Sequence, residues 1–343
     1  MTTAIITASN ILCAIGRGSP QVWASARAGI ARIGDSQLLD RNFDPIQMGL
    51  VPEDALGMLT PDIDRLPLPA RARRMLRIAT PVLQDLAIDT TAPLRLFVGL
   101  PQLAAAEAPW LRHFPNYLQM LTGVPIDATN SVVIAKGRAA ALLALEAARD
   151  ALRSDPSSPV IVGGIDSFLD LHLLGVLGDE GRVLGPRVMD GFIPGEGAAF
   201  LALSAEGTGV AVNGVAHVDD PGHRYGSAPA RGEGLAEAMH LLRGQLQGSP
   251  PPVGVTFAGF NGESFDAKLW GVAQLRHRDF FAPAMAVEHP ADKYGDAGAA
   301  TGAILTALAA TALGDGSRSG SAFVWAASDH ESRGCALLSS TGH

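Results

Sequence analysis

The most constraining feature of this chain is a glycine-rich turn that runs directly into an apolar segment, at residues 190–203. Its letters read DGFIPGEGAAFLAL, with Gly195 and Gly197 on either side of the Glu196 carboxylate. Glycines at this spacing favour a backbone that bends sharply and lies close to another chain segment. The apolar residues that follow are typical of a buried strand. We therefore predict a structural turn at Gly195, Glu196 and Gly197 that leads into a strand.

Apolar strands and amphipathic helices alternate along the chain. This alternation predicts an α/β fold with a mostly parallel sheet covered on both faces. Because the series occurs twice, we expect two related halves, residues 1–205 and 206–343, within one structural unit. The expected strands of the first half are 4–8, 94–100 and 160–162, the last stopped by Gly163 and Gly164, and its helices are 21–28, 67–86 and 138–152. In the second half we expect strands at 210–218 and 253–257, helices at 234–247 and 302–313, a break at 249–252, and a closing hairpin of 322–327 with 335–339.

Charge argues against a nucleic-acid partner. The formal net charge is −8, whereas binding to a phosphate backbone needs a positive footprint. The densest basic cluster is Arg71, Arg73 and Arg74, followed by Arg77. We expect these side chains to form a solvated helix face. A site for a pantetheine phosphate or for an acidic partner surface is the alternative.

Cysteine use and hydropathy indicate a protein of a reducing compartment that does not insert into membranes. Cys13 and Cys335 are the only cysteines of the sequence, and neither their number nor their spacing suggests a disulfide framework or a zinc site. The longest uncharged stretch, 297–314, is shorter than a membrane span and rich in small residues, so we expect a buried helix there. The first residues have neither a basic nor a long apolar region, so we expect no signal peptide and a cytoplasmic location. We also expect no metal and no cofactor.

The turn at 190–203 resembles the DGF-x-x-GEGA segment of β-ketoacyl synthases, the condensing enzymes of the thiolase superfamily. Further similarities extend the resemblance over nearly the whole chain. They are Trp23, Gly29 and Ile30 near the start, the helix after residue 138, the Val162-Gly163-Gly164 strand end, and the Gly295–Gly302 stretch. The resemblance implies a thiolase fold with five αβαβα layers and two pseudo-repeated halves. It also implies a homodimer in which the edge strands that carry the nucleophiles pair across a two-fold axis.

The catalytic positions of the family hold other residues in this chain. The resemblance places a cysteine thiolate at a helix N-terminus, where the helix dipole lowers the thiol pKa, and two histidines and a lysine around it. Those positions match Arg138 (Gly137 or Lys136 with a shift of one or two residues), Gly259, Asp296 and Ala291 respectively. None of the four is a nucleophile that a neighbouring base could activate. We therefore expect no catalytic residue and interpret the chain as a pseudoenzyme of the ketosynthase type.

Five polar residues are candidates for a vestigial pocket: Arg138, Asn261, Glu263, Asp292 and Asp296. A buried charge needs a partner, so we expect Asp296 to pair with Arg138 or to cap the following helix. Asp296 could instead form a carboxylate pair with Asp292 or with Glu263 if their loops meet. Other groups that could react are Cys13, expected in the loop after the first strand, and Cys335, both expected to be buried and inert. His289 and His330 are the histidines nearest the matched pocket segments, and we expect them to have packing or surface roles.

Three functions fit these residues. Short strings, among them Asn261-Gly262-Glu263 and Trp270-Gly271, resemble ketosynthase-like accessory proteins encoded with type VI secretion effectors and their adaptors. That resemblance implies an inactive scaffold or co-chaperone for an effector or adaptor. The first alternative is a non-catalytic partner of an active ketosynthase, similar to a chain-length factor, although such proteins tend to keep the histidine motifs. The second is an acyl-binding enzyme with altered chemistry that uses Asp296, Glu263 or Cys13. The bland interpretation of the Asn-Gly-Glu string is a tight turn.

Overall fold

The structure is a computed structural model that describes residues 3–88, 90, 92–103, 108–246 and 252–341. Its strands follow one continuous order, β11-β10-β12-β13-β9-β1-β8-β7-β5-β6, with β2 paired to β1, and β3 and β4 form a separate hairpin. The end of the predicted helix 234–247 and most of the predicted break at 249–252 fall outside the described residues. The strands are β1 (Ala4–Cys13), β2 (Gly16–Arg17), β3 (Gly34–Leu39), β4 (Pro45–Met48), β5 (Arg95–Leu100), β6 (Val132–Ala135), β7 (Val160–Ser167), β8 (Glu196–Ser204), β9 (Val210–Asp219), β10 (Val253–Ala258), β11 (Phe281–Glu288), β12 (Ser321–Ala327) and β13 (Ser332–Ser340).

The strand order has an internal symmetry. Read outward from the centre, β1-β8-β7-β5-β6 on one side matches β9-β13-β12-β10-β11 on the other, and corresponding pairs have the same orientation. The two series meet only where Ala4 to Ile6 pair with Val210 to Val212. Two pseudo-repeated halves are therefore present, as the sequence predicted. The exact division at residues 205 and 206 stays a prediction, and it falls between β8 and β9.

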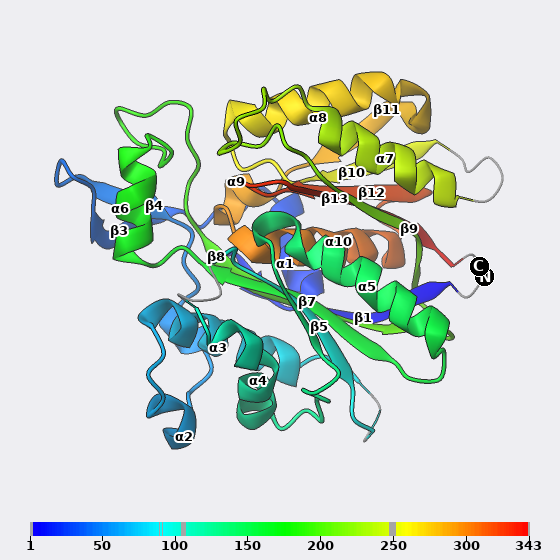
Figure 1. The fold of residues 1–343 in the computed structure, drawn as a ribbon, viewed down its shortest axis with the longest axis horizontal. Helices are drawn as coiled ribbons and strands as arrows, with labels where there is room; N and C mark the ends of the chain where they lie inside the picture. The colour runs from blue at the N-terminus through cyan, green and yellow to red at the C-terminus, as the bar shows by residue number, and fades with distance from the viewer. Residues whose placement is uncertain (1–2, 89, 91, 104–107, 247–251, 342–343) are drawn as a thin grey trace.

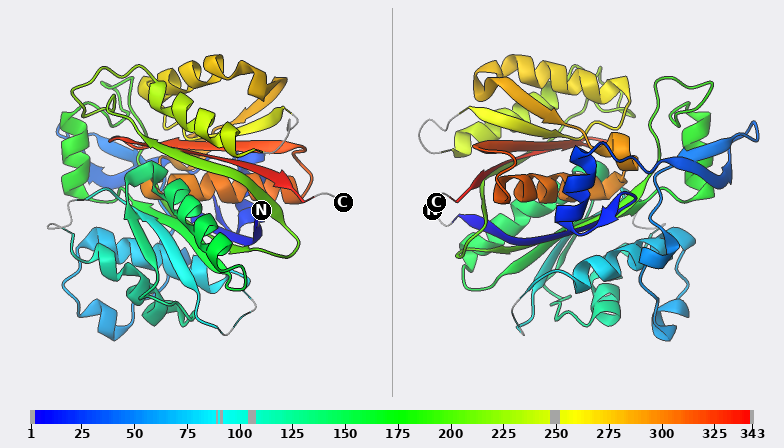
Figure 2. Two further views of the ribbon diagram at one scale, coloured as in Figure 1. Left: turned by 45° about the vertical axis from the view of Figure 1, so that its right-hand side comes forward. Right: turned by 180° about the vertical axis from the view of Figure 1, so that it is seen from behind.

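The two halves of the continuous strand order form two β layers, and helices fill three layers around them, which gives the αβαβα arrangement (Figure 1). The central pair, α5 and α10, lies between the sheets, while α3 and α4 cover one outer face and α7 and α8 cover the other (Figures 1 and 2). The helices are α1 (Ser19–Arg27), α2 (Pro61–Asp64), α3 (Ala70–Gln84), α4 (Phe114–Thr122), α5 (Ala140–Ser154), α6 (Leu171–Asp179), α7 (Glu233–Gln245), α8 (Ser264–Arg276), α9 (Ala291–Tyr294) and α10 (Thr301–Gly314). Among the described residues, no helix is long and apolar enough to cross a membrane.

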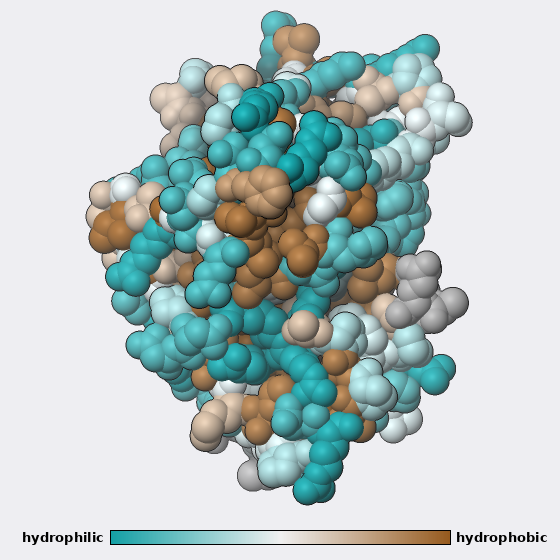
Figure 3. Space-filling view, turned by 90° about the vertical axis from the view of Figure 1, so that its left-hand side faces the viewer, coloured by the Kyte–Doolittle hydropathy of each residue, from teal (hydrophilic) through white to brown (hydrophobic). Residues whose placement is uncertain are grey.

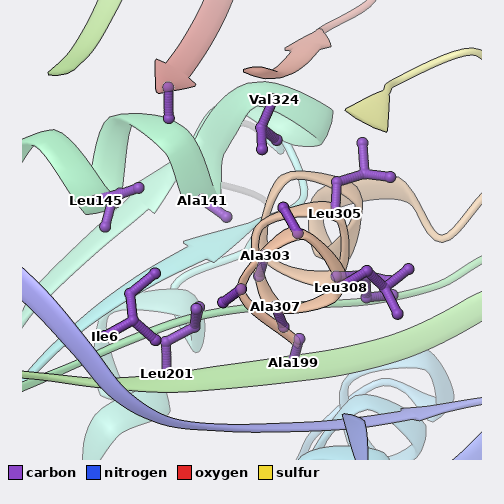
Figure 4. Close-up of a cluster of buried hydrophobic side chains, with 14 of the residues drawn as sticks. Ile6, Ala141, Leu145, Ala199, Leu201, Ala303, Leu305, Ala307, Leu308 and Val324 are labelled. Atoms are coloured by element: carbon purple, nitrogen blue, oxygen red, sulfur yellow. The ribbon is translucent and has the colours of Figure 1, made fainter. Parts of the chain in front are cut away.

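The middle layer is tightly packed because its helices are made of small and aliphatic residues. Helix α10 carries no charged residue and is apolar on every side, the pattern of a helix enclosed by other elements. Ala303, Ala307 and Leu308 of α10 meet α5 and the strands on either side in one core (Figure 4). The prediction of a buried helix within 297–314 is confirmed.

Three predictions about the strands are wrong. The sheet is mixed and not mostly parallel, because β8 and β13 run antiparallel to both of their neighbours. The closing hairpin itself is confirmed, since β13 follows β12 through a short turn and pairs with it antiparallel. Gly163 does not end β7, which continues to Ser167. A Cβ atom on Gly163 would lie 2.2 Å from the ring of Phe200, so this glycine allows close packing of β8 inside the strand. Likewise, Cys13 is the last residue of β1 and does not lie in the loop after it.

Candidate functional site

The glycine-rich turn is an internal anchor of the fold. Glu196 opens β8 with none of its surface exposed, and its carboxylate accepts hydrogen bonds from the backbone N–H of Val51, the hydroxyl of Ser167 and the guanidinium of Arg74. The flanking glycine Gly195 has no room for a side chain, because a Cβ atom there would lie 2.6 Å from the carbonyl oxygen of Tyr294. The close approach predicted from the sequence is thus present.

The basic cluster on α3 is not the solvated face that the sequence predicted. Arg71 and Arg74 are buried. Arg71 donates to Asp166 at 2.7 Å, and Arg74 donates to both oxygens of Glu196 at 2.6 and 3.0 Å. Each of the two arginines is thus paired with a buried carboxylate. A buried charge is tolerated when it is paired and hydrogen-bonded, so these arginines can lie inside the protein.

Arg138 lies at the start of a central helix, where the resemblance places the nucleophile. The residue belongs to the short 3-10 turn Gly137–Ala139 that leads into α5, and only 4% of its surface is exposed. Its Nε donates to the Asp296 carboxylate at 2.6 Å, and its Nη1 lies 2.9 Å from a carboxylate oxygen of Asp329. The predicted pairing of Arg138 with Asp296 is confirmed. Asp296 also accepts from the backbone N–H of Gly298, so it caps the next turn as well.

The ion pairs continue into a larger buried network. Arg182 donates to both oxygens of Glu263, at 2.9 and 2.8 Å, and also to Asp329. The Asn261 amide donates to Glu263 at 2.9 Å and to Asp296 at 3.2 Å, which connects the two sets of pairs. Among the vestigial-pocket candidates, Arg138, Asn261, Glu263 and Asp296 therefore lie together. We call these four residues, with Arg182 and Asp329, the ion-pair cluster.

Neighbouring charges favour the ionised forms of Asp329 and Arg138, whereas Asp266 at the border of the cluster behaves differently. Although burial opposes ionisation, the nearby Arg138 and Arg182 hold the pKa of the Asp329 carboxyl far below its usual range. The Asp296 and Asp329 carboxylates raise the pKa of Arg138 despite its burial. Asp266, on α8, is buried with less compensation, and desolvation raises its pKa to about 7.

The remaining predicted positions lie outside the cluster. The Asp292 side chain on α9 is exposed and pairs with Lys293 at 2.9 Å, so it does not join Asp296. Ala291, at the position of the family's lysine, begins α9. Gly259 follows β10, where a Cβ atom would lie 2.8 Å from the carbonyl oxygen of Trp325, so backbone packing requires the glycine.

A cavity of about 180 Å³ lies beside Arg138. Its polar lining includes Arg71, Arg182 and Asp329, and its apolar lining comes largely from α6. His330 also lines the cavity and contacts the ring of Tyr225, with 5.1 Å between the centroids, so its placement near the pocket was correctly predicted. Among the described residues, no group of three His, Cys, Asp or Glu side chains could hold a metal ion.

The other groups considered for chemistry are not arranged for it. Cys13 and Cys335 are buried free thiols, and burial raises the pKa of Cys13 to about 12 and that of Cys335 further. His289 is half exposed and lies 3.8 Å from Asp292. A thiol that is buried and held protonated is a poor nucleophile.

Sequence reasoning missed Arg182, Asp329 and also Arg224, whose Nη2 lies 3.0 Å from a carboxylate oxygen of Glu263. Asp329 could have been found, because it follows β12 and Glu263 follows β10, and these neighbouring strands are parallel. The carboxyl ends of parallel strands meet at one edge, so charged residues after them are expected to come together. Arg182 and Arg224 lie in irregular segments, where no periodic pattern indicates the direction of a side chain.

Solved structures of ketosynthases have the same fold. The ishigamide ketosynthase/chain length factor matches with a TM-score of 0.74 at 17% identity, over 99% of this chain and 100% of that one. A chain of the ketosynthase in complex with its chain length factor from Xenorhabdus doucetiae matches with a TM-score of 0.76 at 15% identity, over 99% and 98%. The ketosynthase from module 6 of the bacillaene synthase of Bacillus subtilis matches with a TM-score of 0.79 at 14% identity, over 99% and 72%.

These likenesses establish the fold, which is that of the thiolase-like ketosynthases, as the sequence predicted. No family model and no curated protein sequence matches the chain. Function must therefore be argued from the residues of the site.

Proposed function

We propose that this chain is a non-catalytic protein of the ketosynthase fold that pairs with an active ketosynthase, in the way that chain length factors accompany theirs. The observation that carries the proposal is the buried position of Arg138 between two carboxylates. At the position that matches the nucleophile, the chain has a guanidinium held by Asp296 and Asp329, and a guanidinium stays protonated in proteins. The names of two similar structures supply the kind of partner, since both include a chain length factor.

The edge of the sheet next to Arg138 supports pairing with a second chain. In the described structure β6 (Val132–Ala135) pairs with β5 alone, and its four residues are apolar, without charge or proline. An apolar edge of this kind is a template for another strand unless something covers it. The opposite edge, β11, is different, because it contains Pro283 and ends at Glu288. The proposed interface is therefore the β6 edge.

The experiment is affinity purification of the tagged chain from its native host, with identification of co-purified proteins by mass spectrometry. A ketosynthase with a cysteine at the position aligned with Arg138 is the expected partner. Val132→Lys, on β6, should abolish its recovery, whereas Val287→Lys, on β11, should not. The two valines are matched controls because 36% and 37% of their surfaces are exposed and both lie on edge strands.

Other outcomes decide against the proposal. Self-association through β6 without a ketosynthase would favour the homodimer expected from the sequence. A secretion effector or adaptor as the main partner would favour the type VI scaffold, which stays a prediction without a structural observation in its support. An acyl group on the purified chain after incubation with acyl-CoA, lost in Asp296→Ala, would favour an enzyme with altered chemistry.

A further inference from the structure

A second cavity, of about 450 Å³, lies on the other side of α6. One wall is α6, and the facing wall is the β3–β4 hairpin with the segment 183–188. Figure 1 shows these elements together at one end of the molecule, and Figure 3 shows that hydrophobic side chains gather on the face seen from that end. Leu174 and Gly175 of α6 line this cavity, whereas Leu173 and Val176 line the one beside Arg138. The two cavities are therefore separate sites.

The lining of this outer cavity is partly aliphatic, and the two arginines at its rim are each paired with a carboxylate. Arg41 lies 3.7 Å from Asp179, and Arg187 lies 3.2 Å from Asp44. The Asp40 carboxylate accepts hydrogen bonds from the backbone of its own turn. Both arginines of the lining are thus paired with carboxylates, and the remaining charge, Asp40, is negative, so no cation is left for an anionic ligand. The aliphatic part of the lining includes Leu39, Ile46, Leu171, Leu174, Val183 and Val188.

Two glycines of α6 keep the cavity open. Gly175 and Gly178 both line it, and a Cβ atom on either would meet no other atom within 4 Å. Glycine inside a helix lowers helix stability relative to alanine. Packing therefore does not require glycine at these positions, and a larger side chain there would occupy the free space. Helix α6 therefore has residues that lower its stability at two positions that line the cavity.

We propose that the outer cavity binds an uncharged small molecule with an aliphatic chain. Its volume lies within the range of about 300–1,000 Å³ found for small-molecule sites. The aliphatic part of its walls favours a chain removed from water, and its rim, where both arginines are paired and Asp40 adds a negative charge, disfavours an anionic head group. This site is independent of the partner proposed for the β6 edge.

The test uses N-phenyl-1-naphthylamine, an uncharged dye that fluoresces in apolar surroundings. The full-length protein should bind the dye saturably, and 1-decanol should displace it. Gly175→Leu should weaken binding at least tenfold, because the new side chain fills the cavity. Gly244→Leu, at an exposed glycine of α7 where a Cβ atom also has open space, should bind like the wild type.

Three results would overturn the proposal: no saturable binding by the wild type, equal binding by Gly175→Leu, or displacement by decanoate as efficient as by 1-decanol. If Gly175→Leu does not fold, hydrogen exchange of the wild type decides. Added 1-decanol should slow exchange in α6 and in segment 183–188, and unchanged exchange there would contradict the site.

Discussion

The guanidinium of Arg138 donates to the carboxylate of Asp296 across 2.6 Å, and this bond joins the starts of the two central helices. Arg138 precedes α5 in the first half of the strand order, and Asp296 precedes the turn into α10 in the second. Both side chains are almost completely buried. The pair is therefore a structural link between the pseudo-repeated halves.

Breaking this pair should destabilise the protein strongly. Arg138→Met would leave the Asp296 carboxylate buried with only the weaker donors of Asn261 and Gly298, and removing one partner of a buried pair costs about 3–5 kcal/mol. Urea unfolding followed by circular dichroism measures the loss. Arg153→Met is the control, because Arg153 pairs with Asp150 at the surface and such pairs contribute about 1 kcal/mol or less.

Removing both charges should lower the free energy of unfolding by less than the sum of the losses in the two single variants. The double variant Arg138→Met/Asp296→Leu leaves neither of the two charges buried, although Asp329 loses one partner. We expect a coupling free energy of about 2 kcal/mol or more from a double-mutant cycle. Additive effects would show that the two side chains are energetically independent, which would contradict the link.

Glu196 should behave as a buried anchor whose charge matters. Glu196→Gln keeps the shape of the side chain but replaces a carboxylate oxygen that accepts hydrogen bonds by an amide that donates, opposite Arg74. We expect a loss of about 3 kcal/mol in the free energy of unfolding. Glu53→Gln is a matched control, since Glu53 also pairs with Arg74 but is mostly exposed, and its change should cost about 1 kcal/mol or less. Equal losses would contradict the anchor role.

The sequence could predict the fold because its signals are local. The turn around Glu196 and the uncharged stretch of α10 each specify their own surroundings, since close approach and burial on all sides limit the residue types that fit. The pairing of Arg138 with Asp296 was predictable for a similar reason, because two charges placed at buried positions need each other.

The features that the sequence did not predict depend on contacts between segments that are far apart in the chain. The arginines of α3 have the spacing of an exposed helix face, and only the positions of Asp166 and Glu196 in the folded chain turn Arg71 and Arg74 inward. The direction of β8 was mispredicted because it looks like any apolar strand and periodicity does not reveal orientation, whereas the antiparallel pairing of β13 with β12 followed from the predicted hairpin. The outer cavity is formed by a hairpin and a helix more than a hundred residues apart in the chain.

Gly195 should not tolerate even a methyl group. A Cβ atom in Gly195→Ala would lie 2.6 Å from the carbonyl oxygen of Tyr294, so the backbone would have to move, and we expect a loss of about 1–3 kcal/mol. Gly244→Ala is the control, because Gly244 is exposed on α7 with room for a Cβ atom, and alanine should stabilise the helix there by about 0.5–1 kcal/mol. Thermal unfolding of both variants measures the difference. A neutral Gly195→Ala would contradict the close approach.

The two thiols should be inert in the folded protein. Cys13 and Cys335 are buried, and burial raises the pKa of each thiol, so little thiolate forms at neutral pH. At pH 8, iodoacetamide should label both at least about a hundredfold more slowly in the native protein than in guanidinium chloride, because labelling needs local opening. Mass spectrometry of the intact chain gives the rates. Rapid labelling of Cys13 in the native protein would contradict this prediction and would support the alternative in which Cys13 acts as a nucleophile.

Asp266 should make stability fall as the pH rises. Its pKa in the folded protein, raised to about 7 by desolvation, exceeds the value of an unfolded aspartate, about 4. Between these values the folded state binds more protons than the unfolded state, so this group's contribution is complete below about pH 4 and lost as the pH rises towards 7. The slope it adds is at most about 1.4 kcal/mol per pH unit.

Asp266→Asn isolates that contribution, because the amide does not titrate while the other carboxylates remain. Asp329 acts in the opposite direction, since the pKa of its carboxyl is lowered by Arg138 and Arg182, and its contribution is lost as the pH falls below about 4. Urea unfolding of the wild type and of Asp266→Asn at pH 5 and pH 8 should show that the variant gains stability relative to the wild type at the higher pH. A constant difference between the two proteins over this range would mean that Asp266 ionises as freely when folded as when unfolded.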